Sequence, residues 1–112
     1  MDDSDEFSIA TEERGGRLHV VPYGELDLAT SPELEDLVLA RLRDGATVVL
    51  DLRELEFMDS SGVRVLIAAH ATASEGSGHL VLVRPSSGGA VNRIIEISGL
   101  EDELGWVDKP ED

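Results

Sequence analysis

The sequence contains no cysteine, few basic residues and no long apolar run. The absence of cysteine excludes a disulfide framework and thiolate chemistry. Nine Lys and Arg stand against 24 Asp and Glu, which leaves a formal net charge of −15. Phosphate backbones and anionic lipid surfaces repel such a chain, so direct binding to nucleic acid or to a membrane is disfavoured. No apolar run reaches the roughly 18 residues that a membrane-spanning helix needs.

The 112 residues do contain enough apolar material, 41%, for one hydrophobic core. This length predicts a single domain covering 1–112. Half of the 24 acidic residues lie near the two ends. We expect the ends, 1–6 and 108–112, to be solvated and partly frayed, although they could instead steer a basic partner. The acidic N-terminus lacks the basic-then-apolar order of a secretory signal, which favours a cytoplasmic protein.

The hydropathy pattern predicts strands alternating with helices. The first two predicted strands read as a hairpin, and strand–helix–strand units follow them. We therefore expect an α/β fold with a mixed sheet of about four to five strands, flanked by three to four helices. The expected elements are strands at 7–11 and 17–23, a helix starting at 30–33, a strand at 46–51, a helix at 63–73, a strand at 79–83, a helix over 91–98 and a short strand within 104–107.

Local signals refine four of these elements. Ser31 can cap the first helix, with Pro32 in its first turn, and Asp44-Gly45 is expected to end it. The continuous β-rich run at 46–51 is typical of a strand buried on both faces. The segment 57–62 is expected to be a loop into the second helix, and Gly99 stands where a helix C-cap belongs.

The loop before the second helix carries Asp59, Ser60, Ser61 and Gly62. Helix capping explains one of the three polar residues, but not a doubled serine followed by glycine. A helix N-terminus tolerates an added phosphate, and a glycine allows another protein's backbone to approach closely. Phosphorylation would add about −1.5 to −2 charges beside Asp59. Repulsion from Asp59 would oppose the gain at the helix cap, so a phosphate here would suit the disruption of a docking surface rather than stabilisation of the fold. Helix capping without phosphorylation is the other interpretation of this segment.

Catalytic and metal-binding alternatives are poorly supported. A nucleophilic serine needs a base, and His70 lies ten residues beyond Ser60, about 15 Å along the same predicted helix. The three histidines lack the paired spacing of a zinc site, and no glycine-rich phosphate loop occurs. We expect no enzymatic activity, no metal and no cofactor.

Asp51 offers a different alternative, because it ends an apolar strand. Such an aspartate is typical of the phosphoacceptor of response-regulator receivers. Receivers also need an acidic pair after their first strand and a lysine after their last parallel strand. Here the only lysine is Lys109, in the tail, and Asp2 and Asp3 precede the first strand. The alternative interpretation of Asp51 is a polar residue that ends a strand at the edge of the sheet.

Three motifs together resemble STAS-domain anti-sigma factor antagonists. The first is Phe57-Met-Asp-Ser-Ser-Gly62, which follows the Val-Val-Leu-Asp-Leu strand. The second is Gly24-Glu-Leu-Asp27, and the third is Ile94-Ile-Glu-Ile-Ser-Gly-Leu100. Each motif is weak alone, but the three occur in the family's order and spacing. The resemblance covers residues 7 to about 107.

The resemblance implies a bacterial partner switch that controls transcription. In the family, the unphosphorylated antagonist binds an anti-sigma factor that is also a serine protein kinase with a histidine-kinase-like ATP fold, and a sigma factor is released. The kinase phosphorylates the serine that matches Ser60, and a PP2C-type phosphatase reverses the reaction. By the same match, Asp27, Asp59, Ser61 and Gly62 belong to the docking surface.

Two departures from the family pattern concern the partner and the fold. Val63-Arg64 replaces the common Leu-Gly, and Arg64 could pair with a phosphate or with a partner's acid. The chain also stops soon after Val107, so the family's last helix is expected to be missing or very short. The alternative function is a STAS partner-binding scaffold that phosphorylation does not regulate.

Overall fold

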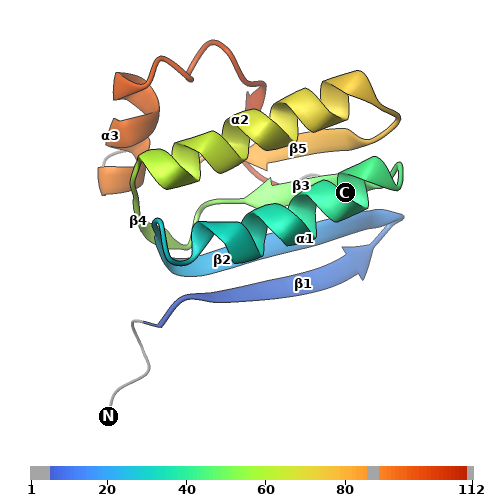
Figure 1. Cartoon of the computed structure of the whole chain (residues 1–112), viewed down its shortest axis with the longest axis horizontal. Coiled ribbons are helices and arrows are strands. Elements are labelled where there is room, and N and C mark those ends of the chain that lie inside the picture. Colours follow the sequence, from blue (N-terminus) through green and yellow to red (C-terminus); the bar gives the residue numbers. More distant parts are fainter. Residues whose placement is uncertain (1–5, 86–88, 111–112) are drawn as a thin grey trace.

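The computed structural model describes residues 6–85 and 89–110 and contains six strands and three helices. Figure 1 shows α1 and α2 side by side on one face of the sheet, with α3 at one end beside the start of α2. In chain order the elements are β1 (Ser8–Arg14), β2 (Arg17–Leu26), α1 (Ser31–Arg43), β3 (Thr47–Asp51), β4 (Leu55–Met58), α2 (Ser60–Glu75), β5 (His79–Val83), α3 (Gly89–Ile97) and β6 (Trp106–Val107).

The sheet is mixed, as predicted. β1 and β2 form an antiparallel hairpin, and β2, β3, β5 and β6 then run parallel in that spatial order. The hairpin turns at Gly15 and Gly16, whose φ angles are +57° and +80°. Glycine fits this turn because a side chain is strained at positive φ. The hairpin and the parallel strands confirm the α/β class.

The sixth strand, β4, corrects the prediction of four to five strands. It occupies part of the segment that was expected to be a loop, and it pairs in parallel with the end of β2, Leu26 opposite Met58. Its burial pattern does not alternate, because Leu55 and Met58 are buried and the two residues between them are exposed. Periodicity cannot reveal such a short strand, since the pairing with β2 defines it.

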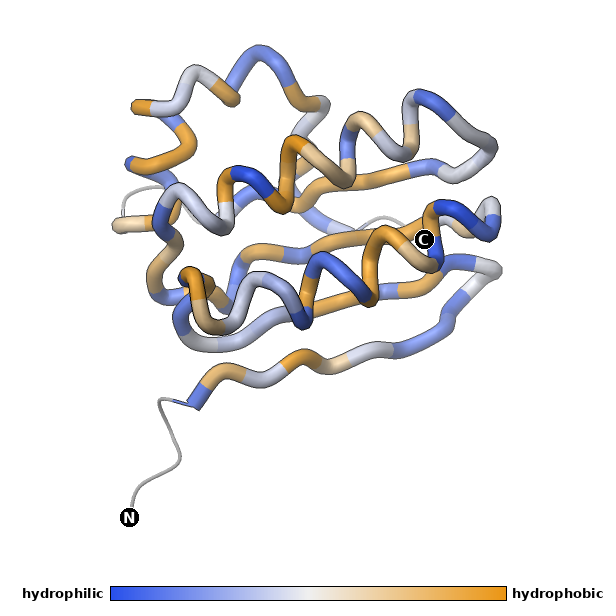
Figure 2. The backbone as a smooth tube through the Cα atoms, viewed as in Figure 1, coloured by the Kyte–Doolittle hydropathy of each residue, from blue (hydrophilic) through white to orange (hydrophobic). Residues whose placement is uncertain are grey.

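Apolar side chains fill the space between the sheet and the helices. Leu18 and Val20 of β2 face this core, as do Val48 and Leu50 of β3. Val49 is also fully buried, which confirms that β3 is buried on both faces. Figure 2 shows the hydrophobic colouring of β3. Each fully buried side chain of this kind contributes about 1.5–3 kcal/mol to folding.

The helix boundaries differ from the expected ones at two N-termini. Ser31 is the first residue of α1 rather than its cap, and Thr30 occupies the cap position without a side-chain capping bond. α2 begins at Ser60, three residues earlier than expected, because Asp59 caps it. The end of α1 is as predicted: Asp44 is the C-cap and Gly45 follows with φ +86°.

The chain returns to the core after α3. Gly99 has φ +75° just past the helix end, and Leu100 and Leu104 are buried. Trp106 of β6 is half-buried, and its indole nitrogen donates to the Leu100 carbonyl at 3.0 Å. The described residues after α3 form no further helix.

The two predicted acidic ends lie partly outside the described residues, at 1–5 and 111–112, and residues 86–88 also lie outside them. None of the helices in the described part of the chain combines the length and hydropathy that crossing a membrane requires.

Candidate functional site

The ends of two paired strands bring the candidate residues together. Leu26 and Met58 are partners in the β2–β4 register, and the Asp59 amide donates to the Leu26 carbonyl at 3.2 Å. The loop that begins at Asp27 therefore lies beside the junction that begins at Asp59. The sequence placed these two aspartates 32 positions apart, and the pairing of β4 with β2 makes them neighbours.

Asp59 caps α2. Its backbone is extended, and its Oδ1 accepts a hydrogen bond from the Ser61 amide at 2.8 Å. This bond satisfies one of the N–H groups that the first turn of a helix leaves without partners. The capping interpretation of the Asp-Ser-Ser segment is therefore confirmed for Asp59.

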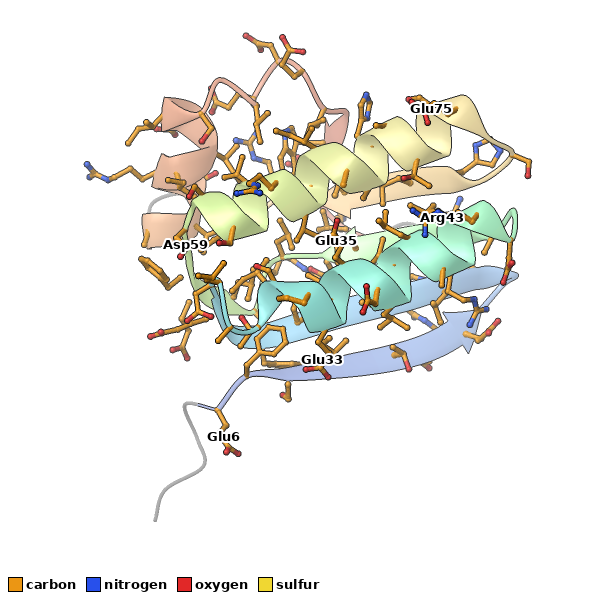
Figure 3. The ribbon with its side chains drawn as sticks, in the orientation of Figure 1. Glu6, Glu33, Glu35, Arg43, Asp59 and Glu75 are labelled. Atoms are coloured by element: carbon orange, nitrogen blue, oxygen red, sulfur yellow. The ribbon has the colours of Figure 1, made fainter. Side chains whose placement is uncertain are left out.

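Ser60 is the exposed residue of this segment. It is the first residue of α2, while Asp59 and Ser61 on either side are half-buried. Within the described residues its hydroxyl makes no hydrogen bond. Figure 3 marks this end of the helix with the label of Asp59, far from Glu75 at the other end. An outside reactant can therefore reach the Ser60 hydroxyl.

Asp27 shapes the loop before α1. Its Oδ1 accepts bonds from the Ala29 amide at 3.0 Å, from the Thr30 amide at 3.1 Å and from the Thr30 hydroxyl at 3.1 Å. The Glu25 carbonyl lies 2.9 Å from the same Thr30 hydroxyl and shares its single proton with Asp27. These bonds hold the loop in one shape beside Asp59.

Gly62 is buried in the first turn of α2. A side-chain Cβ at this position would overlap Cγ of Met58 and would lie 2.9 Å from Cδ2 of Leu26. Both neighbours belong to the core. The close approach that glycine allows is therefore made by this protein's own β2 and β4, and it holds the start of α2 against the sheet.

Two hollows flank the start of α2. The smaller, of about 250 Å³, lies between the starts of α1 and α2 and includes Ser61 and Arg64. The larger, of about 530 Å³, lies between the β4–α2 junction and α3 and includes Ser60 and Arg93. Arg64 and Arg93 are exposed, and neither side chain makes an ion pair or a hydrogen bond within the described residues.

The larger hollow was missed by the sequence analysis. Ile97 was a usable signal, because it is an apolar residue off the face of the third helix that carries Val91, Ile94 and Ile95. In the structure Ile97 is 73% exposed and lines this hollow.

Asp51 lies elsewhere, in a hollow of about 460 Å³ that it shares with Arg53, His19 and Tyr23. Its side chain is buried, and the Arg53 guanidinium binds both of its oxygens, at 3.0 Å and 2.8 Å. The hydrogen bond to Asp51 raises the pKa of Arg53. Asp51 is the polar residue that ends β3, as expected. The expected position at the sheet edge is wrong, because β3 is a central strand and Asp51 is buried.

The described residues contain no group of three or more side chains that could hold a metal ion together. The groups available around Ser60 are therefore its exposed hydroxyl, the N-terminus of α2 and the exposed side chains of Arg64 and Arg93.

A comparison with protein families identifies the family of this chain. A family model described as "Mlab, STAS domain" matches residues 9–107. The chain belongs to the STAS domain family. The expected family membership is thus confirmed over nearly the whole described chain.

Curated relatives of this STAS domain share its length. The anti-sigma-B factor antagonist of Listeria monocytogenes is 31% identical over 98 residues, which cover 86% of this chain and 84% of the relative. The anti-sigma-B factor antagonist of Staphylococcus aureus is 30% identical over 80 residues, which cover 70% and 72%.

Solved structures share the fold of this STAS domain. An anti-sigma factor antagonist from Mycobacterium paratuberculosis has a TM-score of 0.77 at 28% identity, covering 94% of this chain and 88% of that one. The antagonist SpoIIAA in its unphosphorylated form has a TM-score of 0.71 at 23% identity, covering 89% and 88%. Bacillus SpoIIAA in its phosphorylated form has a TM-score of 0.66 at 22% identity, covering 89% and 91%.

The structure assembles most of the predicted site of this STAS domain at one end. Asp27 and Asp59 lie in adjacent loops, Ser60 and Ser61 open the helix, and Arg64 follows one turn later. Gly62 lies directly beneath them in the core.

Proposed function

We propose that this STAS domain is an anti-sigma factor antagonist switched by phosphorylation of Ser60. Its unphosphorylated form binds a serine-kinase anti-sigma factor with a histidine-kinase-like ATP fold, and a sigma factor is released. The observation that carries the proposal is the exposed Ser60 hydroxyl at the first position of α2, with no partner in the described chain. The names of the relatives support the same function.

The switching reaction is a phosphoryl transfer from ATP bound to the kinase. A base on the kinase accepts the hydroxyl proton, and the Ser60 oxygen forms a bond to the γ-phosphorus. The bond from that phosphorus to the β,γ-bridging oxygen breaks, and ADP leaves. A PP2C-type phosphatase then hydrolyses the ester with water, which restores the hydroxyl and releases inorganic phosphate.

The effect of the phosphate is electrostatic. It adds about −1.5 to −2 charges at the wall of the larger hollow and beside the Asp59 carboxylate. The whole chain already has a formal net charge of −15. Because Asp59 bonds to the Ser61 amide and not to Ser60, the modified side chain can stay exposed without unfolding the helix cap. We therefore expect the phosphate to break the interface rather than the fold.

The test uses wild-type, Ser60→Ala and Ser60→Asp baits in a pull-down from the host lysate, with ATP or ADP present. We expect the first two to retain the kinase and mass spectrometry to find phosphate on Ser60 of the wild type. Ser60→Asp should bind at least tenfold more weakly, about 1.4 kcal/mol, and should melt at the wild-type temperature.

The matched control is Ser74→Asp, an equal change of charge at an exposed serine near the other end of α2. The substitution lies fourteen residues from Ser60, about 21 Å along the helix, and should leave binding unchanged. A partner that binds Ser60→Asp as well as wild type, with Ser60 unmodified, would contradict the switch and favour an unregulated STAS scaffold.

A further inference from the structure

The larger hollow beside Ser60 is an open groove with an apolar floor and two walls. β4 and the first residue of α2 form one wall, and α3 forms the other. Its main lining residues are Phe57, Met58, Ser60, Arg93, Ile94 and Ile97.

The groove exposes apolar surface that the fold does not use. Phe57 is 40% exposed and Ile97 is 73% exposed, whereas Met58 beneath them is buried. Single exposed apolar residues are ordinary on protein surfaces, but these two share one groove. Figure 2 shows α3, one wall of the groove, coloured largely as hydrophobic. Such a groove suits an inserted apolar side chain.

The position of Ser60 in the wall of the groove identifies the occupant. A stable protein–protein interface covers about 800 Å² on each partner, which corresponds to a patch about 16 Å in radius. Any protein that holds Ser60 against its ATP therefore also covers the groove. We infer that the groove supplies most of the affinity of the kinase-docking surface. It receives an apolar side chain of the serine-kinase anti-sigma factor. This inference rests on the proposed function.

Charge around the groove adds a second feature to the occupant. Two charged residues line the groove, Asp59 on the wall opposite α3 and Arg93 on α3. The Arg93 side chain is exposed and has no ion-pair or hydrogen-bond partner in the described residues. A carboxylate next to the inserted apolar side chain would pair with it. A second copy of this chain is a poorer occupant, because two chains of formal charge −15 repel each other.

The smaller hollow is about half as large, and it places Arg64 and Glu35 beside Ser61. It exposes one large apolar side chain, Leu28, whereas the groove beside α3 exposes two, Phe57 and Ile97. Apolar anchors in a well-packed pocket contribute most of the affinity of an interface. The groove beside α3 is therefore where truncation should matter most.

The experiment measures the affinity of the purified kinase that the wild-type chain captures in the pull-down. Ile97→Ser removes the most exposed apolar side chain of the groove without adding charge, so repulsion does not confuse the result. We expect at least a tenfold rise in Kd, and the same direction for Phe57→Ser. Tyr23→Ser is the control, because Tyr23 is a 42% exposed apolar residue in the separate hollow with Asp51. It should bind like wild type.

A second pair of variants tests the carboxylate. Arg93→Gln should raise Kd about threefold and reduce the salt dependence of binding, because one charge pair is lost. Arg43→Gln removes an equal charge from an exposed arginine at the other end of the molecule, where Figure 3 labels it. It should change neither quantity.

The outcomes separate the two proposals. If the kinase binds the wild type and Ile97→Ser equally, the groove inference is overturned and the proposed function stands. If the wild type captures no kinase, both are overturned. Self-association of the wild-type chain that Ile97→Ser abolishes, seen by sedimentation, would assign the groove to a second copy and overturn the inference.

Discussion

The hollow with Asp51 and the groove beside Ser60 both contain charged side chains, but within the described residues only those of the first bind one another. In the hollow with Asp51, the carboxylate is bound by Arg53, and Arg14 lies 3.7 Å from Glu12 and 3.3 Å from His19. In the groove beside Ser60, neither Ser60 nor Arg93 has a partner in the described chain. Groups that bind one another stabilise the fold, whereas groups directed outward are available to another molecule.

The largest expected effect comes from the glycine that holds the Ser60 end against the sheet. Gly62→Ala should lower the free energy of unfolding by about 2 kcal/mol, because its Cβ would overlap Met58 and Leu26 in a filled core. Urea denaturation measures this change. Gly76→Ala is the control, because its Cβ would lie 3.6 Å from the Thr72 carbonyl oxygen, an ordinary van der Waals contact. An equal loss in both variants would show that Gly62 has no special packing role.

A smaller loss of stability is expected from removing the ion pair between Asp51 and Arg53. Asp51→Ala removes the acceptor of the Arg53 guanidinium and of the Arg53 amide, which should cost about 1.5 kcal/mol. The affinity for the kinase should stay at the wild-type value. Asp36→Ala removes the same charge from an exposed position of α1 and should leave stability within about 0.5 kcal/mol. Loss of kinase binding at constant stability would place Asp51 in the interface.

The smallest expected loss of stability comes from substitutions of Asp59, the cap of α2 beside the groove. Asp59→Ala should cost about 1 kcal/mol, because the Ser61 amide loses its acceptor. Asp59→Asn keeps an acceptor and should cost only a few tenths of that. If the Asp59 charge also contacts the kinase, Asp59→Asn should weaken binding without lowering the melting temperature. Equal losses of stability for both variants would contradict the capping role.

Much of the fold was predictable because its signals are local. The hairpin glycines, the buried run of β3 and the Gly45 helix end all follow from neighbouring residues, and the structure confirms each. β4 was not predictable, because four residues with buried ends and an exposed middle carry no periodic signal. The start of α2 was placed three residues too late, because Asp59, Ser60 and Ser61 all suit an N-cap and only the structure shows that Asp59 takes this position.

The candidate site was predictable in composition but not in shape. The Asp-Ser-Ser-Gly run identified the helix start with Ser60, and the family resemblance pointed to Asp27. The sequence could not show that Gly62 faces the core, that Asp51 is bound by Arg53, or that α3 forms a groove with β4.

The sequence by itself determined the class of fold, the capped helix start and the acidic surface, because these depend on composition and on residues a few positions apart. Only the tertiary structure decided which side chains remain open to a partner. That outcome depends on strand pairing and helix packing between distant segments: β4 beside β2 makes Asp27 and Asp59 neighbours, and α3 against β4 creates the groove beside Ser60. Contacts between distant segments form only when the whole core is buried, so a local pattern does not encode them.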